Sequence, residues 1–266
     1  ADIVVRCRGR VKRADLLTPV EMGPDSRDFR LQCSLFNAPD IAPFSPIVLT
    51  RTLMQLHDHI NSLGRDLKQR FGEKVHKLSI NAQFTCPNRD GTLGLGGCTF
   101  CNNASFNART QTQQSIREQL ESSKPGMRAK RYLAYFQAYT NTYAEVETLR
   151  QMYQEALEVA DIAGLCVGTR PDCVPDATLD LLASYQDQGA EVWLELGLQS
   201  AFDATLERIN RGHNFAAYVD AVQRAQARNL KICTHLIIGL PGEAPSDSLI
   251  TLDRVLEQGC QGLKLH

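Results

Sequence analysis

The chain has 266 residues, of which 43% are apolar and 22% charged, and its formal net charge is -1. This composition is typical of a globular protein with one large domain or two small ones. No apolar run approaches the roughly 18 residues of a membrane span, and no secretory signal is found, so the protein is not expected to enter a membrane. The near-zero charge excludes a broad basic surface for nucleic acid but allows a local one.

Residues 1–53 differ in composition from the rest of the chain. They contain five prolines, and their apolar residues follow neither a helical nor a strand period. We therefore expect an extension that is disordered or loosely packed.

From residue 53 onward, short apolar runs alternate with amphipathic segments. Apolar residues at helical spacing predict a helix from Leu53 to Leu67 that is ended by Gly72. Six apolar runs predict strands, over residues 77–84, 132–139, 164–169, 191–198, 230–240 and 262–266. Three further helices are predicted around residues 146–157, 179–185 and 249–256, the last one with Ser246 as its N-cap.

This alternation of strands and helices predicts a parallel α/β sheet, which is either doubly wound or a barrel. In both arrangements functional side chains gather at the C-terminal ends of the strands. The sequence stops at His266, directly after an apolar run, which would leave an edge strand uncovered. We therefore expect the domain to be incomplete at its C-terminal end.

Three of the nine cysteines lie close together in a glycine-rich segment that follows the first predicted strand. It reads Cys86-Pro-Asn-Arg-Asp-Gly-Thr-Leu-Gly-Leu-Gly-Gly-Cys98-Thr-Phe-Cys101. In a chain long enough to bury a core, this pattern favours a reducing cytoplasm and a metal site over a disulfide framework. The other cysteines occur singly, several of them in apolar runs, as buried thiols do.

Three cysteine ligands leave one metal position open. A structural zinc site normally takes four protein ligands, and the nearest spare ligand, His76, precedes a strand. An iron–sulfur cluster with one open iron uses three cysteines directly. The spacing therefore favours a cluster, with zinc as the alternative.

Longer segments carry a family resemblance. Residues 75–106, VHKLSINAQFTCPNRDGTLGLGGCTFCNNASF, resemble the radical S-adenosylmethionine (SAM) superfamily and, more narrowly, the YhcC/YtqA family of bacterial radical SAM proteins. Further matches follow in order: Tyr135-Phe-Gln-Ala-Tyr-Thr-Asn, Gly168-Thr-Arg-Pro-Asp-Cys-Val, Glu195-Leu-Gly-Leu-Gln, Arg211-Gly-His, His235-Leu-Ile-Ile-Gly-Leu-Pro-Gly-Glu and Gly262-Leu-Lys-Leu-His. The resemblance covers residues 54–266, which we expect to form a radical SAM core domain. Met54 is where such a protein is expected to start, so residues 1–53 are expected to lie outside the native protein.

The resemblance implies a fold and a chemistry. The fold is a partial (β/α)6 barrel, here truncated after the sixth strand. Cys86, Cys98 and Cys101 would hold a [4Fe–4S] cluster, with SAM bound to its fourth iron. Reductive cleavage of SAM then yields a 5′-deoxyadenosyl radical that abstracts hydrogen from a substrate. The electron would come from a flavodoxin or ferredoxin type of donor in the cytoplasm.

The family pattern also implies contacts with SAM, although it assigns no catalytic residue. The expected cofactor-binding residues are Gln137, Tyr139, Glu195, Gln199, Arg211, Ile238 and Gly239. Arg211 resembles the arginine that pairs with the SAM carboxylate in oxygen-independent coproporphyrinogen oxidases, a role that suits a guanidinium fork. Structural interpretations stand beside these roles. Arg211 also fits a helix C-cap, Glu195 a solvated carboxylate, and Gly239 a simple turn.

The Thr-Arg-Pro-Asp and Gly-Leu-Pro-Gly-Glu segments also resemble the radical SAM domain of the elongator catalytic subunit, which modifies wobble uridine in tRNA. This resemblance makes tRNA modification at wobble uridine the leading substrate hypothesis. The sequence adds a basic cluster of Arg128, Lys130 and Arg131 before the second strand. Two alternatives stay open: a radical SAM enzyme that acts on a small metabolite, and a non-enzymatic domain stabilised by zinc.

Overall fold

A six-stranded parallel sheet forms the centre of the protein in a computed structural model that describes residues 60–101, 114–124, 126 and 129–266. The strands are β1 (Val75–Ile80), β2 (Arg131–Phe136), β3 (Ile162–Thr169), β4 (Glu191–Gln199), β5 (Lys231–Leu236) and β6 (Gly262–Leu265). They lie side by side in the order β1-β2-β3-β4-β5-β6, all parallel. A doubly wound sheet would reverse this order at a switch point. The fold is therefore the predicted partial (β/α)6 barrel.

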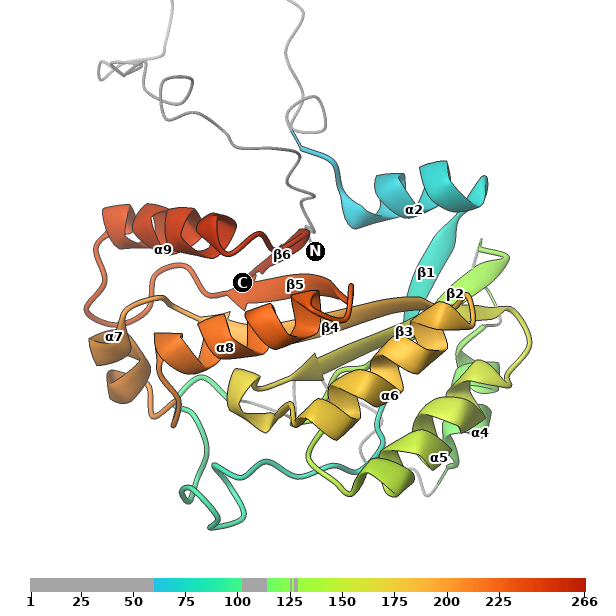
Figure 1. Cartoon of the computed structure of the whole chain (residues 1–266), viewed down its shortest axis with the longest axis horizontal. Coiled ribbons are helices and arrows are strands. Elements are labelled where there is room, and N and C mark those ends of the chain that lie inside the picture. Colours follow the sequence, from blue (N-terminus) through green and yellow to red (C-terminus); the bar gives the residue numbers. More distant parts are fainter. Residues whose placement is uncertain (1–59, 102–113, 125, 127–128) are drawn as a thin grey trace, which may run out of the picture. The chain divides into compact units, whose positions relative to one another are not determined.

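Seven helices and one short turn accompany the sheet in the described part of the chain. The helices are α2 (Leu63–Phe71), α4 (Ile116–Ser123), α5 (Val146–Leu157), α6 (Asp176–Asp187), α7 (Asp203–Arg208), α8 (Phe215–Gln226) and α9 (Pro245–Glu257), and a 3-10 turn, η2, spans Pro171–Cys173. All but α2 follow a strand or its loop on the outer side. Of these, α5, α6 and α8 lie side by side over one face (Figure 1). The core between these helices and the strands includes Phe136, Leu165, Leu194 and Ile232, all fully buried.

The opposite face of the sheet is the concave inside of the partial barrel, and alternate strand residues point into it. Near its base this face is apolar, with Leu133, Cys166 and Trp193 packed together and Leu67 of α2 covering them. Toward the C-terminal ends of the strands it becomes polar. The apolar base thus supports a polar site above it.

Three of the predicted strands extend at least three residues beyond the observed ones. The expected ends at residues 84, 139 and 240 compare with observed ends at Ile80, Phe136 and Leu236. Ala82, Phe84, Ala138 and Leu240 are nevertheless buried, because the loops after the strands also cover the core. The apolar runs therefore continue past the residues that pair in the sheet.

The helix boundaries also correct the sequence interpretation. Ser246 lies inside α9, whose N-cap is Ala244, and the backbone N–H of Ala244 donates to Asp247 at 2.9 Å. Gly72 ends α2 as predicted, with φ of 74°. The start of that helix near residue 53, the predicted extension and the domain boundary at Met54 lie outside the described residues.

Gly164 provides a test of the close contact between β3 and β4. A Cβ at this position would lie 1.9 Å from the carbonyl oxygen of Glu191, and backbone cannot move aside as a flexible side chain can. Gly164→Ala is expected to lower the free energy of unfolding by about 3 kcal/mol. Gly64→Ala is the control, because nothing lies within 4 Å of that site and alanine favours the helix. Urea unfolding that leaves both variants as stable as the parent would contradict this packing.

Candidate active site

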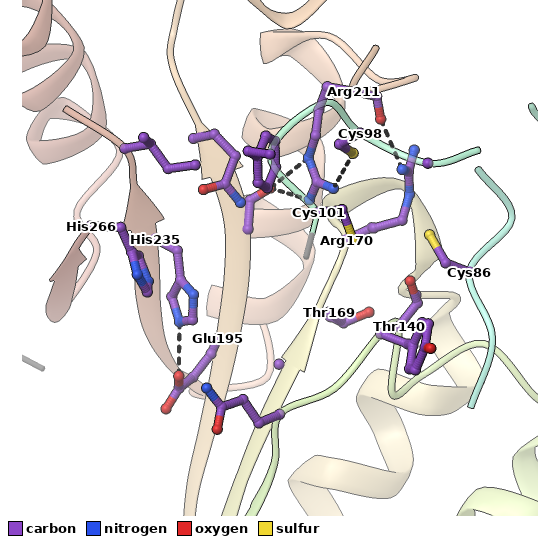
Figure 2. Close-up of a pocket in the computed structure, with 18 of the residues that line it drawn as sticks. Cys86, Cys98, Cys101, Thr140, Thr169, Arg170, Glu195, Arg211, His235 and His266 are labelled. Carbon is purple, nitrogen blue, oxygen red and sulfur yellow. Dashed lines mark hydrogen bonds and ion pairs between the residues drawn. The ribbon is translucent and has the colours of Figure 1, made fainter. Parts of the chain in front are cut away.

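One cavity lies at the C-terminal ends of the strands, and Cys86, Cys98 and Cys101 all line it (Figure 2). Its other polar or aromatic lining side chains are Arg89, Phe100, Tyr135, Gln137, Tyr139, Thr140, Thr169, Arg170, Glu195, Gln199, Arg211, His235, Lys264 and His266. The cavity volume is about 310 Å³. That is at the lower end of the range for small-molecule sites.

The loop that carries the cysteines is closed by hydrogen bonds of its own backbone. Arg89 N donates to Cys86 O at 2.8 Å, Gly97 N to Asn88 O at 2.8 Å, and Cys101 N to Cys98 O at 2.9 Å. Gly97 has φ of 82°, in the left-handed region that favours glycine. The glycine-rich sequence therefore lets this loop fold tightly between Cys86 and Cys98.

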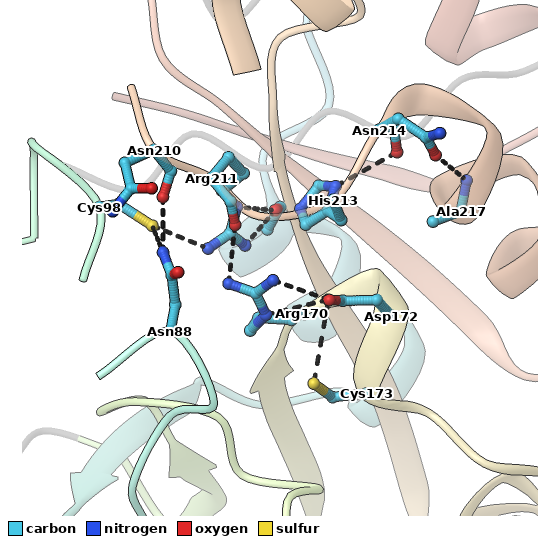
Figure 3. A network of polar contacts seen from close by, with 11 residues as sticks. Asn88, Cys98, Arg170, Asp172, Cys173, Asn210, Arg211, His213, Asn214 and Ala217 are labelled. Carbon is cyan, nitrogen blue, oxygen red and sulfur yellow. Dashed lines mark hydrogen bonds and ion pairs between the residues drawn. The ribbon is translucent and has the colours of Figure 1, made fainter. Parts of the chain in front are cut away.

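The same loop is tied to residues 209–212, which connect α7 to α8. Thr99 N donates to Ile209 O at 3.0 Å, and the Asn210 amide donates to Gly97 O at 2.9 Å. The buried Asn88 amide in turn donates to Asn210 O at 2.5 Å (Figure 3). Two segments more than a hundred residues apart thus hold each other in place.

Two buried arginines connect this assembly to the strands. Arg170, at the end of β3, is 2% exposed; it donates to Arg211 O at 2.8 Å and pairs with Asp172 at 2.7 Å. Figure 3 shows Arg170 between Arg211 and Asp172. The Arg211 guanidinium donates to Gly197 O in β4, and its backbone N–H donates to Leu206 O in α7 at 2.8 Å. The backbone of Arg211 therefore closes the end of α7, as its C-cap interpretation requires, while its side chain contacts the sheet.

Three side chains donate to the cysteine sulfurs. Arg211 Nη1 lies 3.5 Å and Asn88 Nδ2 3.6 Å from Cys98 Sγ, and Arg89 Nη1 lies 3.6 Å from Cys101 Sγ. Burial raises the pKa of the Cys101 thiol, the Arg89 charge opposes this, and the nearby Cys98 thiol adds to it. The sulfurs of Cys98 and Cys101 therefore lie in surroundings that donate hydrogen bonds to thiolates.

The spacing of the sulfurs bears on which metal group they fit. In the described part of the chain, Glu195, Cys233 and His235 form a group whose possible ligand atoms all lie within 4.8 Å of one another. The sulfurs of the three loop cysteines do not meet this criterion, so at least one pair of them lies farther apart. Thiolates on one tetrahedral zinc ion would lie about 3.8 Å apart, given a Zn–S bond of about 2.3 Å. A cubane cluster binds each thiolate at a separate iron and needs a wider spacing. The cysteine loop fits the cluster better than zinc.

A second charged group faces the same cavity from the inside of the barrel (Figure 2). Glu195 is 1% exposed; one carboxylate oxygen pairs with Lys77 and the other lies 2.8 Å from His235 Nε2. Lys264 donates to the Tyr135 hydroxyl at 3.0 Å. The alternative interpretation of Glu195 as a solvated carboxylate is therefore wrong. The Lys77 contact also makes the group of Glu195, Cys233 and His235 a poor cation site.

The protonation states in this group follow from its contacts. Burial alone would raise the pKa of Glu195, but the Lys77 charge and the His235 hydrogen bond more than offset it and lower the pKa. Burial lowers the pKa of His235, only partly opposed by Glu195. At neutral pH an ionised Glu195 thus accepts a hydrogen bond from a neutral His235.

The structure brings most of the predicted SAM contacts together. Five of them line the cavity with the cysteines, namely Gln137, Tyr139, Glu195, Gln199 and Arg211. Ile238 and Gly239 do not line it: Ile238 is 56% exposed, and Ile237 lies against the cavity instead. Gly239 has φ of 80°, as its turn interpretation requires. Sequence reasoning did not predict Lys77 and Lys264 as residues of this site. The feature that could have indicated them is a single lysine in each of two predicted strands, residues 77–84 and 262–266.

Comparison with known families identifies the superfamily. A family model described as the radical SAM superfamily matches residues 81–255. The chain belongs to the radical SAM superfamily. Its members use a [4Fe–4S] cluster and SAM, and the cluster supplies the electron that cleaves SAM into a carbon-centred radical. In this chain Cys86, Cys98 and Cys101 are the residues that would hold it.

Two bacterial proteins share most of the described region. The chain is 62% identical to Protein YhcC of Escherichia coli over 214 residues, which is 80% of this chain and 69% of that protein. It is 40% identical to YtqA of Bacillus subtilis over 212 residues, or 77% of this chain and 65% of that protein. These matches confirm the predicted resemblance to the YhcC/YtqA family, and the chain spans about two thirds of each relative.

Two more distant relatives match a shorter segment. A tRNA uridine(34) acetyltransferase of Dehalococcoides mccartyi is 31% identical over 106 residues, 39% of this chain and 22% of that protein. Elongator complex protein 3 of Schizosaccharomyces pombe is 29% identical over 106 residues, 39% of this chain and 19% of that protein. The predicted resemblance to the elongator subunit is confirmed as a distant one that covers part of the chain.

The cysteine ligands can be tested by iron binding. After anaerobic reconstitution the parent chain is expected to hold about four irons. Alanine at Cys86, Cys98 or Cys101 should remove most of this iron, measured with acid-labile sulfide. Cys173→Ala is the matched control, since burial, with Asp172 adding to it, raises the pKa of this thiol to about 12. Equal iron loss in the control, or full iron in a loop variant, would contradict the assignment.

His213 makes stability depend on pH. Burial, reinforced by the Arg211 charge, lowers the pKa of His213 to about 4, and its Nε2 is buried without a hydrogen-bond partner among the described residues. Because the folded pKa lies below the unfolded one, the fold is expected to lose stability as the pH falls from about 6.5 to about 4. Urea unfolding across this range should show a shallower loss for His213→Gln than for the parent. Parallel curves would show that His213 takes up its proton without cost.

Proposed function

We propose that this radical SAM enzyme modifies tRNA, with the side chain of wobble uridine as its target. The observation that carries the proposal is the segment shared with a tRNA uridine(34) acetyltransferase. SAM cleavage is the chemistry that the superfamily shares. The proposal concerns only the substrate on which this chain uses that chemistry.

The charge of the side chains that line the cavity suits a nucleotide substrate. Its described residues include the cations Arg89, Arg170, Arg211 and Lys264 and one carboxylate, Glu195. The arginines lie at the cysteine end, and Lys264 lies with Glu195 inside the barrel. Positively charged lining residues favour ligands that bear phosphate, and a nucleotide is one such ligand.

The cavity also provides aromatic surfaces. Phe100 and Tyr139 line it and pack against the core, and Arg89 lies 5.9 Å from the centre of the Tyr139 ring. An enzyme that acts on a base takes the base out of its stack and holds it between such side chains. The wobble base already lies in a single-stranded loop, so this step costs least there.

The basic cluster does not serve this cavity. Lys130 and Arg131 lie at the N-terminal end of β2, opposite the end where Gln137 and Tyr139 line the cavity, and Arg131 pairs with Glu73. Arg128 lies outside the described residues. The support for tRNA therefore comes from the cavity and the relatives.

We place SAM between the cysteine loop and the side chains after β2 and at the end of β4. Gln137, Tyr139 and Gln199 are its proposed partners, since each lines the cavity. Both oxygens of Glu195 are already engaged by Lys77 and His235, so Glu195 acts on SAM only through His235.

The proposal includes a flavodoxin or ferredoxin type of electron donor and a cytoplasmic location. The seven cysteines in the described part of the chain are free thiols, as expected in a reducing compartment. No helix in that part combines the length and apolar character that crossing a bilayer requires.

The test uses the full chain after anaerobic reconstitution, with SAM, reductant and tRNA from bacteria that lack the YhcC-like protein. We expect the tRNA to increase release of 5′-deoxyadenosine, and nucleoside mass spectrometry to show one wobble nucleoside converted into another. Cys98→Ala should abolish both signals. tRNA cut on the 3′ side of the anticodon provides the control for a requirement for the folded loop.

Other results would select the alternatives. If a protein-free and RNA-free metabolite fraction stimulates SAM cleavage and tRNA does not, the substrate is a small metabolite. If the chain holds zinc and releases no 5′-deoxyadenosine, the zinc-stabilised domain is correct.

A further inference from the structure

Two cations point at the sulfurs of two different cysteines. Arg211 Nη1 donates to Cys98 Sγ at 3.5 Å, and Arg89 Nη1 donates to Cys101 Sγ at 3.6 Å. They come from separate parts of the chain, Arg89 from the cysteine loop and Arg211 from the connection between α7 and α8. Their convergence on the thiols is therefore a property of the folded site.

The direction of the Arg211 guanidinium is fixed on two sides. Its Nε and Nη2 donate to Gly197 O, which leaves Nη1 directed at Cys98, and Arg170 holds its backbone carbonyl. Arg211 is 7% exposed. A Cβ on Gly197 would lie 2.8 Å from Arg211 Nη2, so glycine keeps the space for this arginine.

Arg89 occupies a comparable niche. A Cβ on Gly97 would lie 3.0 Å from Arg89 Cγ and 3.1 Å from its Nη1, so glycine is needed there too. The other side of the guanidinium faces the ring of Tyr139. Both arginines thus have their guanidinium groups positioned by neighbouring groups in addition to the cysteine sulfurs.

A cation next to a thiolate ligand affects the two oxidation states of a cluster unequally. The reduced cluster carries one more negative charge, so a nearby positive charge stabilises it more than the oxidised cluster. The effect is larger in a buried site, where water screens less. Hydrogen bonds to ligand sulfurs act in the same direction and are an established means of tuning cluster potentials.

We propose that Arg89 and Arg211 are positioning residues that raise the reduction potential of the cluster by donating to the sulfurs of Cys101 and Cys98. This role comes before SAM binding and is independent of the substrate. It rests on the superfamily cofactor and on the three cysteine ligands, and not on tRNA.

The test is the midpoint potential of the reconstituted full chain without SAM, measured by spectroelectrochemistry. Arg89→Gln and Arg211→Gln should each shift the potential to more negative values, and the double variant should shift it further. Arg89→Lys and Arg211→Lys keep the charge and lose the fork, so smaller shifts are expected. Arg208→Gln is the matched control, because Arg208 donates to Pro241 O and not to a sulfur.

A second measurement separates this role from SAM binding. If Arg211 pairs with the SAM carboxylate instead, Arg211→Gln will weaken SAM binding and leave the SAM-free potential unchanged, which overturns the proposal for Arg211. If the Arg211→Gln variant fails to hold iron, the midpoint potentials of Arg211→Lys and Arg89→Gln test the proposal instead. Arg89 is only half-buried, so its substitution is less disruptive to the fold. Potentials equal to that of the parent in those two variants would overturn the proposal, whatever the fate of the tRNA hypothesis.

Discussion

The site depends on the hydrogen bonds between the cysteine loop and residues 209–212. The loop has little regular structure of its own, with one isolated bridge between Asp90 and Leu95. The paired contacts of Asn88 and Asn210 hold it against the connection from α7 to α8. Buried backbone groups need such partners, because an unsatisfied one costs about as much as a lost hydrogen bond. The position of Cys98 follows from this pairing.

The barrel explains why distant segments can meet there. Because the strands run in sequence order, the ends of β3 and β4 lie beside each other, and Arg170 reaches from one to the backbone that follows α7. A buried guanidinium is costly unless it is paired and hydrogen-bonded, and Asp172 supplies that pairing. One cation thereby joins the sheet, the connection and, through Arg211, the thiol of Cys98.

Sequence reasoning predicted the six strands and the cysteine loop, since apolar runs and ligand spacing are local signals. It placed strand ends too late, because Phe84 and Leu240 are buried in loops. The prediction of a cofactor contact at Ile238 missed the neighbouring Ile237, which lines the cavity, because the direction of a side chain is known only once the strand end is known. The partner of Glu195 was unpredictable for another reason: Lys77 lies 118 residues away in β1, and the two side chains meet only in the folded partial barrel.

The central claim is that the protein's own hydrogen bonds hold the cysteine loop in place. Amide hydrogen exchange on the iron-free full chain tests it most directly, at Gly97, Thr99 and Cys101, whose N–H groups donate within the loop or to Ile209. The account predicts slow exchange at all three amides, comparable to that of strand ends and changed little by reconstitution. Exchange as fast as in an unfolded chain, with protection only after the cluster is inserted, would show that the metal organises the loop and would contradict the account.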